Sequence, residues 1–301
     1  MKRQLLGVAA FMLALSAHAQ DNPLWMRYCA ISPDGTSIAF TYKGDIYTVP
    51  VNGGKAAQIT TNAAHDTHPV WSPDGKQIAF ASDRMGSMDI FVVDREGGIP
   101  KRLTTHSGNE TPVAFKDADH ILFLANVMPS AEDAQFPSGQ FQQVYEVSTT
   151  GDRPVMFSSM PMEDISINKT GNALLYHDKK GYEDPWRKHH TSSITRDIWL
   201  CSLDGKRSYR KLTSFNGEDR TPVWASDGKS FYYLSEEKGS FNVFKRALDG
   251  TSSTQLTHHT KHPVRFLTAA DNGTLCYGYD GEIYTMKEGT EPRKVQISIL
   301  T

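Results

Sequence analysis

The sequence has few cysteines, no dominant charge and one long apolar run. Its cysteines are Cys29, Cys201 and Cys276, and an odd number cannot close the disulfide framework that stabilises many small secreted domains. All three lie in apolar, strand-like contexts, so we interpret them as small buried hydrophobic residues. Lysine and arginine total 32 and acidic residues total 34, giving a formal net charge of −2. Nucleic acid is therefore disfavoured as a partner, because binding a polyanion requires a basic surface.

The one long apolar run lies at the amino terminus. Lys2 and Arg3 precede apolar residues 5–15, and a small-x-small cleavage pattern follows at 17–19. This pattern is typical of a secretory signal peptide, predicted over residues 1–19 with a short lead-in at 20–26. No cysteine follows the cleavage site and no later stretch reaches the length of a membrane span, so no membrane span is expected. We expect export across the inner membrane and a periplasmic location.

Sequence patterns for catalysis are also missing. There is no G-x-S-x-G motif, and no serine can be matched to a histidine and an acid in a recognisable order. Adjacent His189 and His190 lack the spaced cysteine or carboxylate partners that zinc sites use. We therefore predict no catalytic residue, no metal site and no cofactor within this chain.

Two nearly identical phrases dominate what is present. "AISPDGTSIAF" at 30–40 returns as "VWSPDGKQIAF" at 70–80, and weaker copies continue to the end of the chain. The apolar run after each turn ends in an aromatic residue: Phe40, Phe80, Phe123, Tyr176, Tyr233 and Tyr277. Each copy contains four short alternating segments and no helical pattern, which is typical of a β-propeller. The sequence predicts an all-β, six-bladed β-propeller over 27–301, with four antiparallel strands per blade.

The innermost strand of each blade is expected just before the turn, in "HPVWS", "TPVAF", "TPVWA" and "HPVRF". Blade 1 begins with its own first strand near residues 27–32, and blade 6 ends with its own fourth strand near 294–299. No strand is left to be exchanged between them. The ring is therefore predicted to close by side-chain packing alone, without strand exchange.

Propeller geometry brings two long loops, 126–142 and 181–195, to the face that also carries the connections between blades. Functional loops on a rigid scaffold are the general expectation. The candidates for channel lining or docking are Trp186, Arg187, Lys188, His189, His190, Arg196, Glu218, Asp219, Arg220 and His262. Two alternatives stay open at this point. The blade 4 loop could be solvated with Trp186 tucked against its blade, or paired carboxylates at 163–164 and 218–219 could act as acid and base.

Larger stretches carry a family resemblance. The opening "NPLWMRYCAISPDGTSIAFTYKGDIYTVPVNGG", the insertion "WRKHHTSSITRDIWL" and the closing "HPVRFLTAADNGTLCYGYDGEIYTM" resemble the amino-terminal six-bladed propeller of the tricorn protease family. The resemblance implies a parent with a second propeller, a PDZ domain and a serine peptidase core that carries the catalytic residues. It also implies that adjacent arginines in the first propeller help to hold the substrate carboxylate. The corresponding connection here, "HSGNETPVAF", has none, so Arg187 with Lys188 are the candidate substitutes.

The resemblance implies an access and docking propeller whose partners are peptides or unfolded polypeptide, the PDZ and peptidase domains, and further copies through the parent. The alternative is a stand-alone TolB-like propeller that binds other envelope proteins, and a third possibility is a lone hydrolase acting at the channel mouth. If the blade 4 loop only docks, replacing Trp186 and Arg187 by alanine should weaken assembly or peptidase activity. The melting temperature of the propeller should then stay nearly unchanged.

Overall fold

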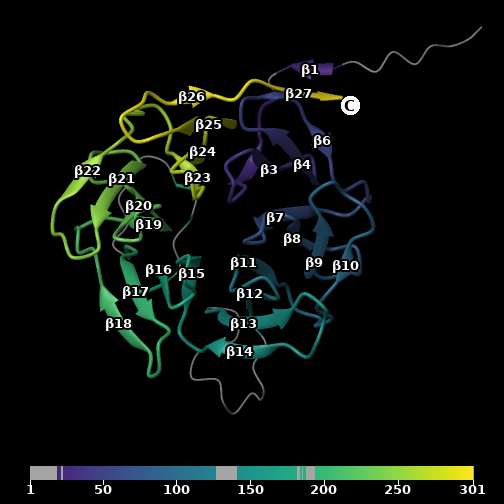
Figure 1. The fold of residues 1–301 in the computed structure, drawn as a ribbon, viewed down its shortest axis with the longest axis horizontal. Helices are drawn as coiled ribbons and strands as arrows, with labels where there is room; N and C mark the ends of the chain where they lie inside the picture. Colours follow the sequence, from purple (N-terminus) through teal and green to yellow (C-terminus); the bar gives the residue numbers. More distant parts are fainter. Residues whose placement is uncertain are drawn as a thin grey trace, which may run out of the picture.

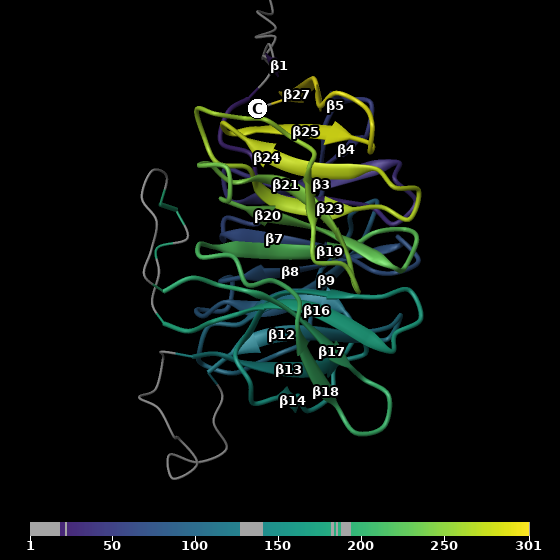
Figure 2. The ribbon, with the colours of Figure 1, turned by 90° about the vertical axis from the view of Figure 1, so that its left-hand side faces the viewer.

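The computed structural model describes residues 19–21, 23–126, 141–181, 184, 186–187 and 194–300. They form six four-stranded antiparallel sheets arranged in a ring (Figure 1), which confirms the predicted six-bladed β-propeller. Seen from the side, the strands run across the disc, so each blade carries turns on both faces (Figure 2). No helix that could cross a membrane occurs in this part of the chain. The predicted signal peptide lies, apart from Ala19, outside the described residues.

The first three blades contain the following strands, from the centre of the ring outward. Blade 1 comprises β2 (Arg27–Ile31), β3 (Ser37–Tyr42), β4 (Asp45–Pro50) and β6 (Ala57–Gln58). Blade 2 comprises β7 (Asp66–Trp71), β8 (Gln77–Ser82), β9 (Asp89–Asp94) and β10 (Lys101–Arg102). Blade 3 comprises β11 (Thr111–Phe115), β12 (His120–Ala125), β13 (Gln143–Ser148) and β14 (Val155–Ser158).

The last three blades continue the same order. Blade 4 comprises β15 (Met162–Ile167), β16 (Ala173–Asp178), β17 (Ile198–Ser202) and β18 (Ser208–Lys211). Blade 5 comprises β19 (Asp219–Trp224), β20 (Ser230–Ser235), β21 (Asn242–Ala247) and β22 (Ser253–Gln255). Blade 6 comprises β23 (Arg265–Ala269), β24 (Leu275–Tyr279), β25 (Glu282–Met286) and β26 (Arg293–Lys294).

The repeated SPDG phrase forms the hairpin between the first and second strands. In blade 1 the hydroxyl of Ser32 donates to Asp34 Oδ1 at 2.5 Å, and the amide of Thr36 donates to the same oxygen at 2.9 Å. Gly35 takes a φ of 72°, which favours glycine. The side-chain hydrogen bonds of Ser and Asp therefore fix the turn locally, and this explains why the phrase recurs.

The core lies between adjacent blades. The six aromatic residues that end the apolar runs are all at most 1% exposed. Burying a side chain of this size contributes about 1.5–3 kcal/mol, so the repeated aromatics are a main source of stability. Neighbouring blades are also joined by polar contacts, such as the hydrogen bond from Trp71 Nε1 to the carbonyl of Ala30 at 2.9 Å.

The ring closes without exchanging a blade strand, as predicted, but the prediction that side-chain packing alone closes it is wrong. After β26 the chain bends and forms β27 (Ile297–Leu300), which pairs in parallel with β5 (Gly54–Lys55) of blade 1 and antiparallel with β1 (Ala19–Asp21). In the described residues each blade still keeps its own four strands, as expected. The sequence predicts one strand near 294–299, whereas the structure has two, β26 and β27. The polar and apolar side chains of this segment alternate as in one continuous strand, so the sequence pattern does not reveal the division.

Main-chain hydrogen bonds make this contact close. The amide of Gly54 donates to the carbonyl of Gln296 at 2.8 Å, and the amide of Ala56 donates to the carbonyl of Ser298 at 2.9 Å. A Cβ on Gly53 would lie 2.4 Å from the Gln296 oxygen, so only glycine fits there. The carboxyl-terminal segment thus binds blade 1 through its backbone.

Candidate functional site

A cavity of about 1060 Å³ runs along the axis of the ring and is lined by residues from all six blades. Its walls come from the innermost strands β2, β7, β11, β15, β19 and β23, each of which ends the strand order of its sheet. The cavity is therefore surrounded by six strand edges whose cavity side is not paired within the blade. The middle of the wall is apolar, with residues such as Val70, Val113, Ile165 and Val223.

Each innermost strand carries a β-bulge near one mouth of the cavity, where its pairing register shifts. In five blades the bulge holds a non-glycine residue at positive φ: Tyr28, His68, Asp164, Thr221 and Phe266. All five line the cavity. Bulges redirect side chains, and such backbone strain costs about 1–3 kcal/mol per residue. Backbone strain is thus concentrated where the ring presents side chains to the cavity.

Aromatic rings from three blades meet at this mouth. The ring of Tyr28 lies 3.7 Å from that of His68 and 4.8 Å from that of Phe266, measured between centroids. Burial lowers the pKa of His68 to about 4, so its imidazole is neutral at neutral pH. The three rings that meet on the side of blades 1, 2 and 6 are therefore uncharged at neutral pH.

Trp186 of the blade 4 loop extends across the mouth to this aromatic surface. Its indole lies 4.9 Å from the guanidinium of Arg27 and 4.9 Å from that of Arg265, and it makes an edge contact with Phe266. Arg265 also donates to the carbonyl of Trp186 at 3.0 Å. The side chain is 41% exposed and lines the cavity. Trp186 thus contacts blades 1 and 6, which contradicts the alternative in which it tucks against its own blade.

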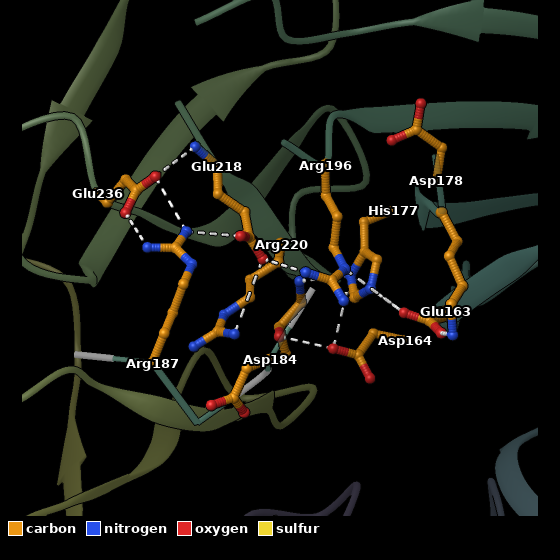
Figure 3. Close-up of polar contacts among 12 residues, drawn as sticks. Glu163, Asp164, His177, Asp178, Asp184, Arg187, Arg196, Glu218, Arg220 and Glu236 are labelled. Carbon is orange, nitrogen blue, oxygen red and sulfur yellow. Dashed lines mark hydrogen bonds and ion pairs between the residues drawn. The ribbon is translucent and has the colours of Figure 1, made fainter. Parts of the chain in front are cut away.

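The next residue, Arg187, anchors the loop in blade 5. Its guanidinium donates to Glu218 Oε2 at 2.6 Å and to Glu236 Oε2 at 2.8 Å (Figure 3). The side chain is buried, so the solvated-loop interpretation is wrong for this residue. The expectation of an unchanged melting temperature after its replacement is also unsupported, because the buried carboxylate of Glu236 would lose its cation and that of Glu218 would lose one of its arginine partners.

A second arginine joins this anchor to blade 4. Arg196 donates to Glu218 Oε1 at 2.6 Å, and its Nε lies 3.5 Å from Glu163 Oε2 (Figure 3). Burial opposes ionisation of Glu163, but hydrogen bonds and charge interactions with His177 and Lys179 outweigh it and hold its pKa well below the usual range. Burial likewise opposes ionisation of Glu218, and the surrounding arginines outweigh it and lower its pKa.

These ion pairs do not favour Glu163 or Glu218 as the general acid of the acid/base alternative. A general acid needs a pKa near the working pH, whereas Glu163 and Glu218 are both held ionised. Asp219 lies in the blade interior beside Ser235 and Thr213, away from the cavity lining, and burial raises its pKa to about 6.

The remaining predicted residues divide into three groups. Arg220 lines the cavity, with its guanidinium 4.0 Å from the ring of Phe241, and burial lowers its pKa to about 10. His262 lies outside the cavity lining and pairs with Asp280 at 3.3 Å. Lys188, His189 and His190 lie outside the described residues, as does most of the other long loop, 127–140.

Sequence reasoning missed Arg265 and Phe266 because it placed the blade 6 strand too early. The sequence likeness of "HPVRF" to "HPVWS" predicts a strand from residue 262, but β23 begins at Arg265, so the His-Pro-Val of blade 6 belongs to the connection before the strand. The structural equivalent of His68 is Phe266, since both occupy the bulge. The signal in the sequence is the arginine-aromatic pair Arg265–Phe266, which forms the first two residues of the strand.

Comparison with known proteins agrees with this architecture. Residues 23–292 match the family described as the tricorn protease N-terminal beta propeller domain. The chain belongs to this family. Tricorn protease homolog 1 of Streptomyces coelicolor is 25% identical over 279 residues, which cover 92% of this chain and 25% of that protein. The chain thus spans about a quarter of the length of this relative.

Solved structures show the same fold. The crystal structure of the tricorn protease superposes with a TM-score of 0.72 at 20% identity, covering 90% of this chain and 26% of that one. TolB from Acinetobacter baumannii superposes with a TM-score of 0.65 at 16% identity, covering 89% of this chain and 62% of that one. At these identities the likeness concerns the fold.

Proposed function

We propose that this propeller is the non-catalytic substrate-access and docking domain of a tricorn-like serine peptidase, and that its central cavity admits peptides or unfolded polypeptide. The observation that carries the proposal is the set of six innermost strand edges around one cavity of about 1060 Å³. Membership of the tricorn family supports the link to peptide degradation. In this proposal, peptides enter and the other domains dock at the cavity mouth that Trp186 covers.

Strand edges suit an extended peptide of any sequence. An unpaired edge offers backbone N–H and C=O groups, and peptide recognition by strand addition uses those groups for affinity. The apolar wall can accept side chains along the chain, while charged groups at the mouth keep it hydrated. A compact folded protein does not fit into such a cavity, so the ligand class is unfolded polypeptide.

The blade 4 loop supports docking as well as access. Tryptophan beside arginine is a composition enriched in interfaces, and Trp186 is held between two arginines while remaining partly exposed. Arg187 fixes the loop to blade 5, so Trp186 is presented on a rigid support. We propose that this mouth faces the catalytic domains of the parent, in the periplasm.

A labelled unstructured peptide titrated with residues 20–301, followed by fluorescence anisotropy, tests peptide admission. We expect saturable binding that Trp186→Ala weakens about tenfold, which corresponds to about 1.4 kcal/mol. The matched control is Tyr209→Ala, which removes a partly exposed aromatic from β18 at the outer edge of the same blade. No binding by the wild type, or equal loss in both variants, would contradict the proposal. A folded envelope protein that binds while the peptide does not would favour the TolB-like alternative.

A further inference from the structure

Two of the three cysteines meet at the seam of the ring. Cys29 lies on β2 of blade 1, and Cys276 lies on β24 of blade 6. Between them lies β23, where Thr268 is the pairing partner of Cys276 and also accepts a hydrogen bond from the amide of Ile31 at 3.1 Å. The Cys29 thiol donates to the carbonyl of Phe266 at 3.6 Å. β2 therefore runs beside β23, and both cysteines belong to one apolar cluster at the seam, where each is a free thiol.

The surroundings of the pair belong to both blades. Cys29 is 2% exposed and Cys276 is fully buried. Both lie in one apolar cluster, which joins Phe40 of blade 1 to Ile283 of blade 6 and includes Ile299 of β27. The cluster is thus the side-chain part of the seam whose main-chain part is the pairing of β27 with β5. Cys201 lies in a different cluster, within blades 3 and 4.

We propose that Cys29 and Cys276 form a disulfide bond that locks blade 6 to blade 1. The oxidant is a small-molecule or protein disulfide, acting by thiol–disulfide exchange. One cysteine thiolate attacks the oxidant and releases one reduced thiol. The second cysteine thiolate then attacks the mixed disulfide, forms the Cys29–Cys276 bond and releases the second reduced thiol. The two cysteine protons pass to the released thiolates, so one disulfide is exchanged for another.

Burial determines when this reaction occurs. Thiol–disulfide exchange needs a thiolate that the oxidant can reach. In the closed ring neither sulfur is accessible, and burial raises the pKa of Cys276 well above its usual value. Oxidation therefore takes place during folding or when the seam opens. Once formed, the bond links two strands that are far apart in sequence, which is the arrangement in which a cross-link most restricts the unfolded chain.

The test is to refold the denatured, reduced chain in a mixture of reduced and oxidised glutathione, then alkylate under denaturing conditions and count free thiols by mass spectrometry. We expect the wild type to retain one thiol, and peptide mapping to find Cys29 linked to Cys276. Cys201→Ser is the matched control and should retain none. Cys29→Ser and Cys276→Ser should show no internal cross-link. Three free thiols in the refolded wild type, or a cross-link to Cys201, would overturn the proposal.

Thermal unfolding of the same samples tests whether the bond acts at the seam. Because each variant is compared with itself before and after reduction, a variant that is less stable overall remains informative. Oxidation should raise Tm by roughly 5–15 °C in the wild type and in Cys201→Ser. Cys29→Ser and Cys276→Ser should show no such rise. An equal rise in all four proteins, or none in the cross-linked wild type, would contradict a stabilising bond at the seam.

Discussion

The guanidinium of Arg187 and the carboxylate of Glu218 lie 2.6 Å apart, and the two side chains are 1% and 0% exposed. Glu218 also pairs with Arg196, and Arg187 also pairs with Glu236. The loop that crosses the cavity mouth is therefore fixed by a buried ionic network. Removing Arg187 from this network would leave Glu236 buried without its cation, so these contacts determine where the neighbouring Trp186 is held.

Replacing Arg187 by alanine should lower the free energy of unfolding by about 3–5 kcal/mol, because Glu236 remains buried without its cation and Glu218 loses one of its arginine partners. Urea unfolding followed by circular dichroism measures the change. The matched control is Lys169→Ala, which removes the exposed pair with Asp271 at 3.1 Å and should cost no more than about 1 kcal/mol. Equal losses in the two variants would show that burial does not govern the Arg187 network.

Glu110 should make the propeller less stable as the pH rises. It is 1% exposed, accepts a hydrogen bond from Thr104, and has Asp89 and Arg102 as its charged neighbours. Burial, with a further contribution from Asp89, raises its pKa from 4.5 to about 7. The folded state therefore holds a proton between pH 4.5 and 7 that the unfolded state has lost. Stability from this group is present below pH 4.5 and is lost as the pH rises through 7.

Glu110→Gln removes this titration while keeping an acceptor for Thr104. Relative to wild type, the variant should gain up to about 3 kcal/mol of unfolding free energy between pH 5 and pH 8. Urea unfolding at the two pH values measures the difference. Glu291→Gln, at an exposed position, is the control and should follow the wild type. A Glu110→Gln variant that also follows the wild type would mean that Glu110 does not titrate in this window.

Residues 20–301, purified alone, should hydrolyse no peptide. The sequence has no nucleophile elbow, and the cavity-lining Glu163 is paired with Lys179 and Arg196. Incubation with a panel of fluorogenic peptides, followed by chromatography, checks this. Turnover that persisted through purification and disappeared on Glu163→Gln or Thr221→Val would reveal a catalytic site in the propeller.

Much of the fold could be predicted from the chain because its signals are local. The SPDG hairpins depend on hydrogen bonds within five residues, and the aromatic residue inside each second strand marks the core between blades. The site was harder to predict. Glycine marks none of the five strained bulge positions, so nothing local in the sequence separates Thr221 or Phe266 from an ordinary strand residue.

The sequence by itself determined the number of blades and the four strands in each, because turn chemistry and alternation act over a few residues. Only the tertiary structure decided that Trp186 reaches blades 1 and 6, that Arg187 is buried between two glutamates, and that Cys29 meets Cys276. These contacts join residues from different blades. Which residues meet depends on how the ring closes. Local patterns along the chain carry no information about the distance between residues of different blades.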